Sequence, residues 1–396
     1  MPVNPAATPS PPTPLTARPR LFSLDVMRGL TMAAMVVVNN PGSWGSVYPP
    51  LRHADWHGCT PTDLIFPFFL FVVGVAMAMP ARSPAFSRVL RRTLWLFGLG
   101  LLLNASSSLV TGKFDPVEFR IMGVLQRIAL CYFAASMVVR WTGLKTQVAL
   151  AAAVLVGYGL VLTQWPAPAG PTPSHGDHSP AGSIVARLDR ALLGSTHLYR
   201  GGPQDPEGLL STLPAVVTVF AGLWSGKLVR RWISPPPRPG LNGLKALPLL
   251  AIGSILLGWA WARWGGLPLN KALWTSSFVL FTGGWAMIVF WLCVILMETQ
   301  SPAHVRWVRN VAGPFQILGV NAIMLFVGSG LLSRVLGAIH LAGATGDIRL
   351  NAWIHERFFT WWLPPPAASL GFALTMLAFW WCVLWICWRR EWILKV

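Results

Sequence analysis

The chain has 396 residues, of which 54% are hydrophobic and only 11% are charged, against about 25% charged residues in an ordinary soluble domain. This composition leaves too little polar surface to coat a globule in water, so it excludes a soluble enzyme, a disordered chain and a disulfide scaffold. The apolar runs are too long for the strands of a barrel. We therefore expect an all-α fold: a polytopic membrane protein with about ten transmembrane helices.

The net charge of +18 raises the question of nucleic-acid binding. The basic residues are scattered between apolar runs instead of forming a basic domain, so we expect no nucleic-acid partner. Lys and Arg in cytoplasmic loops, which set the topology of a membrane protein, explain the charge better. The five cysteines have no spacing typical of metal ligands, and we expect no metal site.

The chain divides into a short tail and one membrane domain. Residues 1–20 are rich in proline and predict a disordered cytoplasmic tail, and residues 21–396 predict a single transmembrane domain. Residues 166–208 form one long outer loop, and the pattern of 183–208 predicts a short amphipathic helix on the membrane face. We expect ten spans, at residues 22–40, 62–80, 91–110, 120–139, 146–165, 209–228, 245–262, 275–297, 313–336 and 366–388.

Ten spans leave both termini on one side of the membrane. If that side is the cytoplasm, 19 of the 31 Lys and Arg lie at the inner side, which favours an N-in and C-in topology. Ten of the 13 acidic residues lie at the outer side instead. Because acids do not set topology, their excess indicates an outer polar site for a cationic or polyol substrate.

The densest polar cluster follows the first span. Asn39 and Asn40 close the span, His53 and Trp56 lie in the loop, and Asp63 stands where the second span begins. Two roles fit Asp63: a helix cap, and a carboxylate that orients the imidazole of His53. His53 is a candidate general base, although histidine in a Trp-rich loop is equally typical of a membrane interface.

Other polar residues lie in or beside apolar runs, where burial is expensive. Asp25 and Arg28 are one turn apart, and they form either a self-neutralising pair or a site in which Arg28 binds phosphate. Arg127 in the fourth span needs either a ligand or an acidic partner on another helix, such as Asp63 or Asp25. The remaining polar residues either link helices to one another or line one shared cavity. They are Gln126, Asp205, Glu207, Asn270, Lys271 and Asn321. Because most of these residues lie at outer span ends, we favour the shared cavity.

Six segments carry a resemblance to a known family. They are SLDVMRGLTMAAMVVVNN, HADWHGCTPTDLIFPFFLFVVG, GVLQRIALCY, LDRALLGSTHLY, DPEGLLSTLP and PLNKALWTSSFVLFTGG. Together they resemble the transmembrane acetyltransferases similar to lysosomal heparan-α-glucosaminide N-acetyltransferase, a family that includes bacterial glucosamine N-acetyltransferases. The resemblance extends from about residue 20 to the C-terminus, and it implies that residues 21–396 form a transmembrane acyltransferase domain.

The resemblance implies a reaction and a set of roles. Acetyl-CoA serves from the cytosolic side, and an amino sugar is acetylated on the other, periplasmic side of a bacterial inner membrane by a homodimer. The family's active-site His stands in an H-x-x-W-x-G element, here His53, Trp56 and Gly58, and the acid that follows it corresponds to Asp63. The Asn that closes the first span corresponds to Asn39 or Asn40. Donor-binding roles are expected for Arg28, Gln126 and Arg127, and acceptor-binding roles for Trp56, Asp205, Glu207, Asn270 and Lys271.

Two other functions fit the same pattern. A multi-span transporter of a sugar-like solute would also place polar residues in its spans, and an O-acetyltransferase acting on a glycan would share the chemistry and change the acceptor. Within the acetyltransferase class, His53 acts either as a general base or through a covalent acetyl-imidazole. Release of free CoA thiol from acetyl-CoA and glucosamine separates an enzyme from a transporter.

Overall fold

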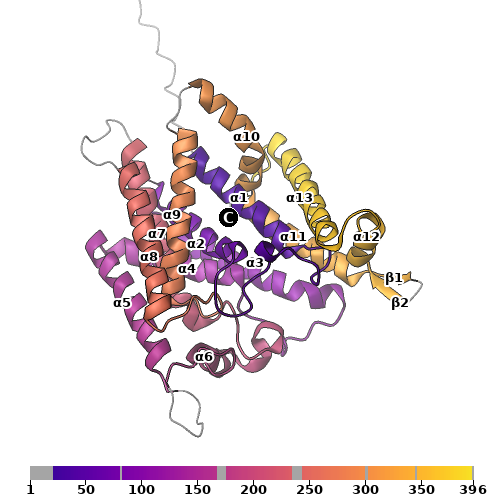
Figure 1. Cartoon of the computed structure of the whole chain (residues 1–396), viewed down its shortest axis with the longest axis horizontal. Helices are drawn as coiled ribbons and strands as arrows, with labels where there is room; N and C mark the ends of the chain where they lie inside the picture. Colours follow the sequence, from indigo (N-terminus) through magenta and orange to yellow (C-terminus); the bar gives the residue numbers. More distant parts are fainter. Residues whose placement is uncertain are drawn as a thin grey trace, which may run out of the picture.

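The computed structural model describes residues 21–80, 83–166, 175–233, 243–298, 302–343 and 346–394; the predicted tail 1–20 lies outside them. The chain is almost entirely helical (Figure 1). The helices are α1 (Phe22–Asn39), α2 (Ile65–Ala78), α3 (Phe86–Val110), α4 (Val124–Trp141), α5 (Leu144–Gln164), α6 (Ile184–Leu193), α7 (Leu209–Ile233), α8 (Gly243–Trp264), α9 (Ser276–Glu298), α10 (Pro302–Val320), α11 (Ala322–Ala338), α12 (Leu350–Phe358) and α13 (Pro365–Arg389). A short 3₁₀ helix, η2 (Pro61–Leu64), precedes α2, and β1 (His340–Gly343) pairs antiparallel with β2 (Gly346–Arg349).

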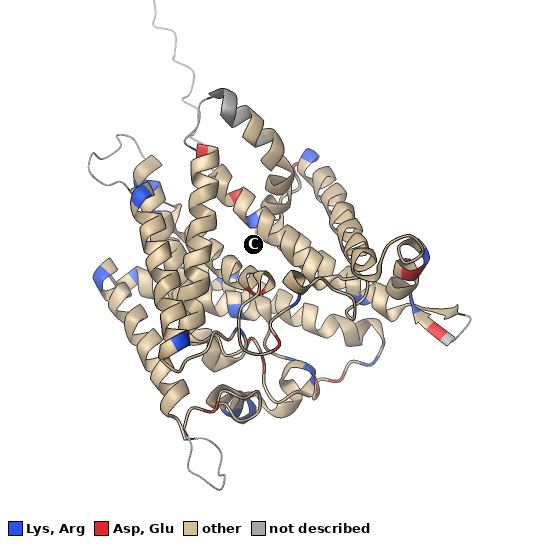
Figure 2. Cartoon of the chain, in the orientation of Figure 1, with Lys and Arg blue, Asp and Glu red and all other residues tan. Residues whose placement is uncertain are grey.

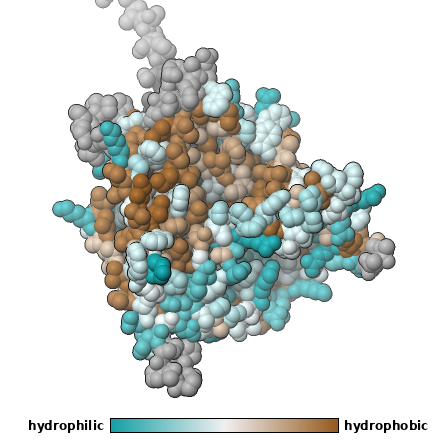
Figure 3. Space-filling view, viewed as in Figure 1, coloured by the Kyte–Doolittle hydropathy of each residue, from teal (hydrophilic) through white to brown (hydrophobic). Residues whose placement is uncertain are grey.

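Membrane-spanning helices dominate the architecture. Among the described residues, nine helices are long and apolar enough to cross a membrane, and the bent pair α10–α11 makes up to ten. The predicted fold class, an all-α polytopic membrane protein with about ten spans, is thereby confirmed. The space-filling view shows apolar residues over the face formed by α8 and α9, with hydrophilic residues gathered below them (Figure 3). Such an apolar surface suits contact with lipid rather than water.

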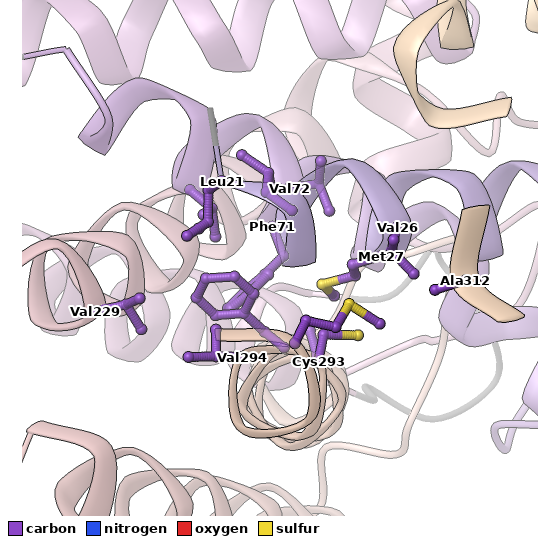
Figure 4. Packing of buried hydrophobic residues seen from close by; sticks show 14 of the residues in the cluster. Leu21, Val26, Met27, Phe71, Val72, Val229, Cys293, Val294 and Ala312 are labelled. Carbon is purple, nitrogen blue, oxygen red and sulfur yellow. The ribbon is translucent and has the colours of Figure 1, made fainter. Parts of the chain in front are cut away.

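One of the large hydrophobic clusters lies where α1, α2, α7 and α9 pack together, with residues of α8 and α10 at its edge (Figure 4). Helices α2 and α7 approach closely because each carries a glycine at the contact. A Cβ atom on Gly74 would lie 1.9 Å from the carbonyl oxygen of Val219, and one on Gly222 would lie 1.9 Å from that of Phe71. Small residues allow this backbone contact, which is a common way to pack helices in a membrane. The contact fixes α2 against α7, and hence the two segments that precede these helices.

Three features depart from the predicted elements. The predicted ninth span, 313–336, is two helices, α10 and α11, which meet at Asn321 with a bend of 71°. Helix α3 begins at Phe86 rather than at residue 91, because its first turns carry arginines that an apolar span excludes. The hairpin β1–β2 and helix α12 were not predicted.

The amphipathic helix predicted within 183–208 is present as α6.

Lys and Arg lie at both ends of the bundle, and most of the Asp and Glu lie in the lower half of the view in Figure 2. We call the end where α1 finishes and where α7 and α9 begin the cavity end, and the other the opposite end. Lys145, Arg230 and Arg389 lie at the opposite end, because α5 begins there and α7 and α13 finish there. If the opposite end faces the cytoplasm, as the sequence predicts, these three residues lie at the inner side.

The topology is testable with single cysteines in a cysteine-free background. We expect His175→Cys, on an exposed residue beyond α5, to react with a membrane-impermeant maleimide in intact cells. Arg231→Cys, on an exposed residue near the end of α7, should react only after permeabilisation. The reverse pattern would contradict the N-in and C-in topology.

Candidate active site

A buried carboxylate organises the cavity end. Asp63 lies at the third position of η2, and its side chain is 2% exposed. Its Oδ2 atom accepts hydrogen bonds from the backbone N–H groups of Ala54 (3.0 Å) and Thr60 (3.1 Å) and from the Thr60 hydroxyl (3.0 Å). This arrangement is a capping box, which satisfies the first N–H groups of the short helix. Asp63 therefore folds the loop before α2 into a fixed shape.

The second carboxylate oxygen holds His53. The Nδ1 atom of His53 lies 2.7 Å from Oδ1 of Asp63. A carboxylate accepts hydrogen bonds, so Nδ1 carries the proton and the lone pair of a neutral ring is on Nε2. The His53 side chain is 47% exposed, in contrast to its buried partner. Both predicted roles of Asp63, as helix cap and as partner of the imidazole, are present in the geometry.

Lys271 approaches the same pair from the loop before α9. Its Nζ atom lies 3.5 Å from Oδ1 of Asp63 and 3.2 Å from Nδ1 of His53. Burial lowers the pKa of Lys271, while the charges of Asp63 and Glu207 act against the shift. The site thus contains a partly buried lysine amine beside a carboxylate and an imidazole.

Asn270 and Trp56 connect this loop to the histidine loop. The Asn270 side-chain amide donates to the carbonyl oxygen of Trp56 at 2.9 Å, and its Oδ1 accepts from the N–H of Leu273 at 2.8 Å. The Trp56 indole N–H donates to the carbonyl oxygen of His178 at 2.8 Å. Asn270 is fully buried, so it positions the loops, whereas Trp56 reaches the cavity described below.

Arg120 is a site residue that the sequence analysis missed. Its guanidinium donates two hydrogen bonds to Asp205, at 2.8 and 2.6 Å, and one to Glu207 at 2.6 Å. Although burial opposes it, these two acids raise the pKa of Arg120. One signal was available: Asp205 and Glu207 are two acids close together before a span, and buried acids require a cation.

These residues surround a polar cavity of about 450 Å³ at the cavity end. Six of the residues that line it were selected from the sequence, and Asp55, Arg120, Tyr199 and Gln204 are among the polar lining residues that were not. The predicted residues that line it are Asn39, His53, Trp56, Asp63, Glu207 and Lys271. Asn39 therefore faces the cavity, whereas buried Asn40 donates to the carbonyl oxygen of Val36 at 2.8 Å and ends α1.

Two further cavities continue toward the opposite end. A middle cavity of about 210 Å³ is largely apolar, is lined by Arg28 and Arg92, and shares Phe69 and Phe326 with the polar cavity. A basic cavity of about 400 Å³ shares Arg92 with the middle cavity. The other cations that line the basic cavity are Arg140, Lys227 and Arg230. The three cavities follow one another along α2, from Asp63 to its far end.

Arg28 forms the predicted pair with Asp25 and also lines a cavity, whereas its predicted binding of phosphate stays a prediction. It pairs with Asp25 at 3.1 Å and donates to the carbonyl oxygen of Gly319 at 3.3 Å, and it also lines the middle cavity. Helix α10 ends at Val320, so this bond helps to satisfy the carbonyl groups at its end. Arg28 is thus held in place beside a space that a ligand can enter.

Gln126 and Arg127 lie away from the three cavities of the described chain. The Gln126 amide donates to the carbonyl oxygen of Ile121 at 2.9 Å. Arg127 is fully buried, donates to the Ser211 hydroxyl and to the carbonyl oxygen of Gly208, and packs against the Trp274 ring at 5.0 Å. Its described partners lie at the start of α7, beside α9 and on α2, where the Phe66 ring is 5.9 Å away, and they do not include the acids Asp63 or Asp25. This geometry favours a structural role over donor binding for both residues.

Asp189 is a second residue that the sequence analysis missed. Its carboxylate is buried in α6 and accepts from the N–H of Leu209 at 2.9 Å, where α7 begins. Burial raises the pKa of Asp189 to about 6, and the hydrogen bond from Leu209 limits the rise. A Cβ atom on Gly208 would lie 1.8 Å from Oδ2 of Asp189, so a larger residue here would force the carboxylate to move. This contact fixes α6 against the segment that carries Glu207.

The fold and the cavities define a polytopic membrane protein with a polar site at one end and cationic groups at the other. A family model described as heparan-α-glucosaminide N-acetyltransferase, catalytic, matches residues 20–250, more than half of the chain, and the chain belongs to this family. It is 26% identical to mouse and 28% identical to human heparan-α-glucosaminide N-acetyltransferase. The matches cover 82% and 78% of this chain and 55% and 52% of the two relatives, so the chain spans about half of their length.

The Asp189 contact predicts a pH-dependent stability. The pKa is about 6 in the folded protein and about 3.9 in an unfolded chain. The native state therefore binds more protons between these values, and stability falls as pH rises from about 4 to 6. Asp189→Asn should remove this component and should unfold at a higher temperature than the parent at pH 8 in the same detergent. A parent whose melting temperature rises with pH across this range, or a variant with the same slope, would contradict the assignment.

Proposed function

We propose that the protein is a membrane-embedded acetyltransferase that moves the acetyl group of acetyl-CoA to the amine of glucosamine or a related amino sugar, with His53 as general base. The observation that carries the proposal is the 2.7 Å contact between His53 and buried Asp63 at the wall of the polar cavity. Family membership supports the reaction class. Family membership also argues against the alternative function, a transporter of a sugar-like solute.

In the proposed chemistry, the two nitrogens of His53 have different roles: Nε2 transfers the proton, and Nδ1 stays bonded to Asp63. The amine nitrogen attacks the thioester carbonyl carbon while Nε2 of His53 accepts its proton. Asp63, bonded to Nδ1, stabilises the imidazolium that forms. The carbon–sulfur bond then breaks, and the leaving thiolate receives the proton from His53. Asn39 and Lys271 line the same cavity and supply N–H donors for the negative charge that develops on the carbonyl oxygen.

The acceptor side of the cavity suits an amino sugar. Glu207 and Asp55 line the cavity with carboxylates, which attract a substrate ammonium group, and Trp56 offers an aromatic face. Asp205 lies behind this wall, where its pairing with Arg120 holds Glu207 in place. We assign substrate contact to Trp56, Glu207 and Lys271, and positioning roles to Asp205 and Asn270.

The donor side follows from the two cavities beyond Phe69 and Phe326. Coenzyme A carries phosphate groups on a long, mostly uncharged arm. Arg28, Arg92 and the basic cavity offer cations for the phosphates at the opposite end, and the apolar middle cavity suits the arm. We propose that this end faces the cytoplasm, so that donor and acceptor meet at His53 from opposite sides of the membrane.

His53→Ala should lower acetyl transfer by about 10²–10⁴-fold, the usual loss when a general base is removed. The ring is half exposed, so the variant should stay folded and still bind acetyl-CoA. Raising the pH should partly restore activity, because more of the amine is then free without enzymatic help. The measurement is the rate of CoA thiol release with glucosamine as acceptor. Near-normal turnover in this variant would contradict the role of His53.

Asp63→Asn tests the carboxylate, and mass spectrometry of the parent separates the two routes that involve His53. If the carboxylate stabilises an imidazolium, this variant should lose activity at all pH values, and mass spectrometry of the parent with acetyl-CoA alone should find no acetylated protein. An acetyl group on His53 under these conditions would favour the covalent route.

Turnover of N-acetylglucosamine, which lacks the free amine, would favour the O-acetyltransferase.

Two adjacent arginines on α3 test the donor route. Arg92 lines the middle and basic cavities, whereas Arg91 is exposed at the surface. Arg92→Ala and Arg28→Ala should each raise the Michaelis constant for acetyl-CoA more than that for glucosamine, because each removes a cation from the proposed phosphate path. Arg91→Ala, which removes the same charge, is the matched control. Equal effects of Arg91→Ala and Arg92→Ala on the donor constant would contradict the route.

A further inference from the structure

The segment that follows α13 folds back onto the middle of the protein. Helix α13 ends at Arg389, and Glu391 takes a left-handed conformation with φ 58°. The N–H of Trp392 then donates to the carbonyl oxygen of Cys387 at 2.8 Å. This reversal brings Trp392–Leu394 against the bend between α10 and α11.

Asn321 holds this segment by both ends of its side-chain amide. Its Nδ2 donates to the carbonyl oxygen of Trp392 at 3.0 Å, and its Oδ1 accepts from the N–H of Leu394 at 3.1 Å. The residue is 1% exposed and lies at the 71° bend, outside the helical conformation. The side-chain amide of Asn321 thus connects the bend to the segment that follows α13 through two hydrogen bonds.

The residues beside these two hydrogen bonds line the middle cavity. Leu394 lines this cavity together with Arg28, and so do Gly319, Val320 and Ala322 on the two sides of the bend. Further along α11, Phe326 lines both the middle and the polar cavity. The residues on the two sides of the bend therefore form part of the wall that the middle cavity shares with the polar cavity.

We infer that Asn321 is a positioning residue for the donor: it holds Trp392–Leu394 as one wall of the middle cavity and so sets the shape of the passage for the thioester arm. The inference rests on the proposed function, because it takes the middle cavity as the path of acetyl-CoA. Asn321 makes its described contacts with main-chain groups, and it acts through Leu394 and α11.

Asn321→Leu removes both hydrogen bonds and keeps the branching and the number of heavy atoms of the side chain. It should raise the Michaelis constant for acetyl-CoA about tenfold, the change expected for the loss of about one net hydrogen bond, with kcat within about twofold and the acceptor constant unchanged. Leu394→Ala, on a residue that is 51% exposed, should change the donor constant in the same direction. The Kd of CoA, measured by calorimetry, should rise with it.

Asn104 provides a matched control at the cavity end. Its amide bridges the carbonyl oxygens of Arg120 and Met122, each at 3.0 Å, and so supports the acceptor site. Asn104→Leu should raise the acceptor constant and leave the donor constant unchanged. If the parent turns over and both Asn321→Leu and Leu394→Ala leave the donor constant unchanged, or if Asn321→Leu raises both constants equally, the inference fails. A parent that releases no CoA thiol would overturn the proposed function instead.

Discussion

The carboxylate of Asp63 is the constraint on which the cavity end depends. A charge buried to this extent is stable only if its oxygens are bonded, and here one oxygen accepts three hydrogen bonds from its own loop. The other oxygen faces His53 and Lys271, which come from different parts of the chain. The need to satisfy one buried group thus fixes the loop before α2, the tautomer of the imidazole and the position of an ammonium group at the same time.

The close packing of α2 and α7 extends this order along the protein. Glycines at the contact hold the two helices together, so the segment that precedes α7 and carries Glu207 lies beside the loop that precedes α2. Along α2, the lining changes from polar near Asp63, through apolar around Phe69, to cationic near Arg92. This order matches the chemistry of the proposed substrates: a polar acceptor at one end, an uncharged arm between, and phosphates at the other end.

Composition and hydropathy were sufficient to predict the spans, because each helix needs about twenty apolar residues to cross a bilayer. The pairing of His53 with Asp63 was also predictable, since both lie in one short loop. Contacts that depend on helix packing were not: Lys271 and His53 are 218 residues apart, and Arg120 and Asp205 are 85 apart. Adjacent helical residues point about 100° apart, so only packing could separate Asn39 from Asn40 or direct Arg127 toward α7. The bend at Asn321 was not predicted, because the residues on both sides of it are apolar and together have the pattern of one span.

The central claim is that donor and acceptor reach His53 from opposite ends of the protein. It is tested most directly in proteoliposomes whose protein orientation is known from the accessibility of a cysteine at one end. In vesicles with the basic cavity toward the lumen, acetyl-CoA sealed inside should acetylate glucosamine supplied only outside, with the product appearing outside and free CoA remaining inside. Acetylation that requires both substrates on the same side of the membrane would contradict the account.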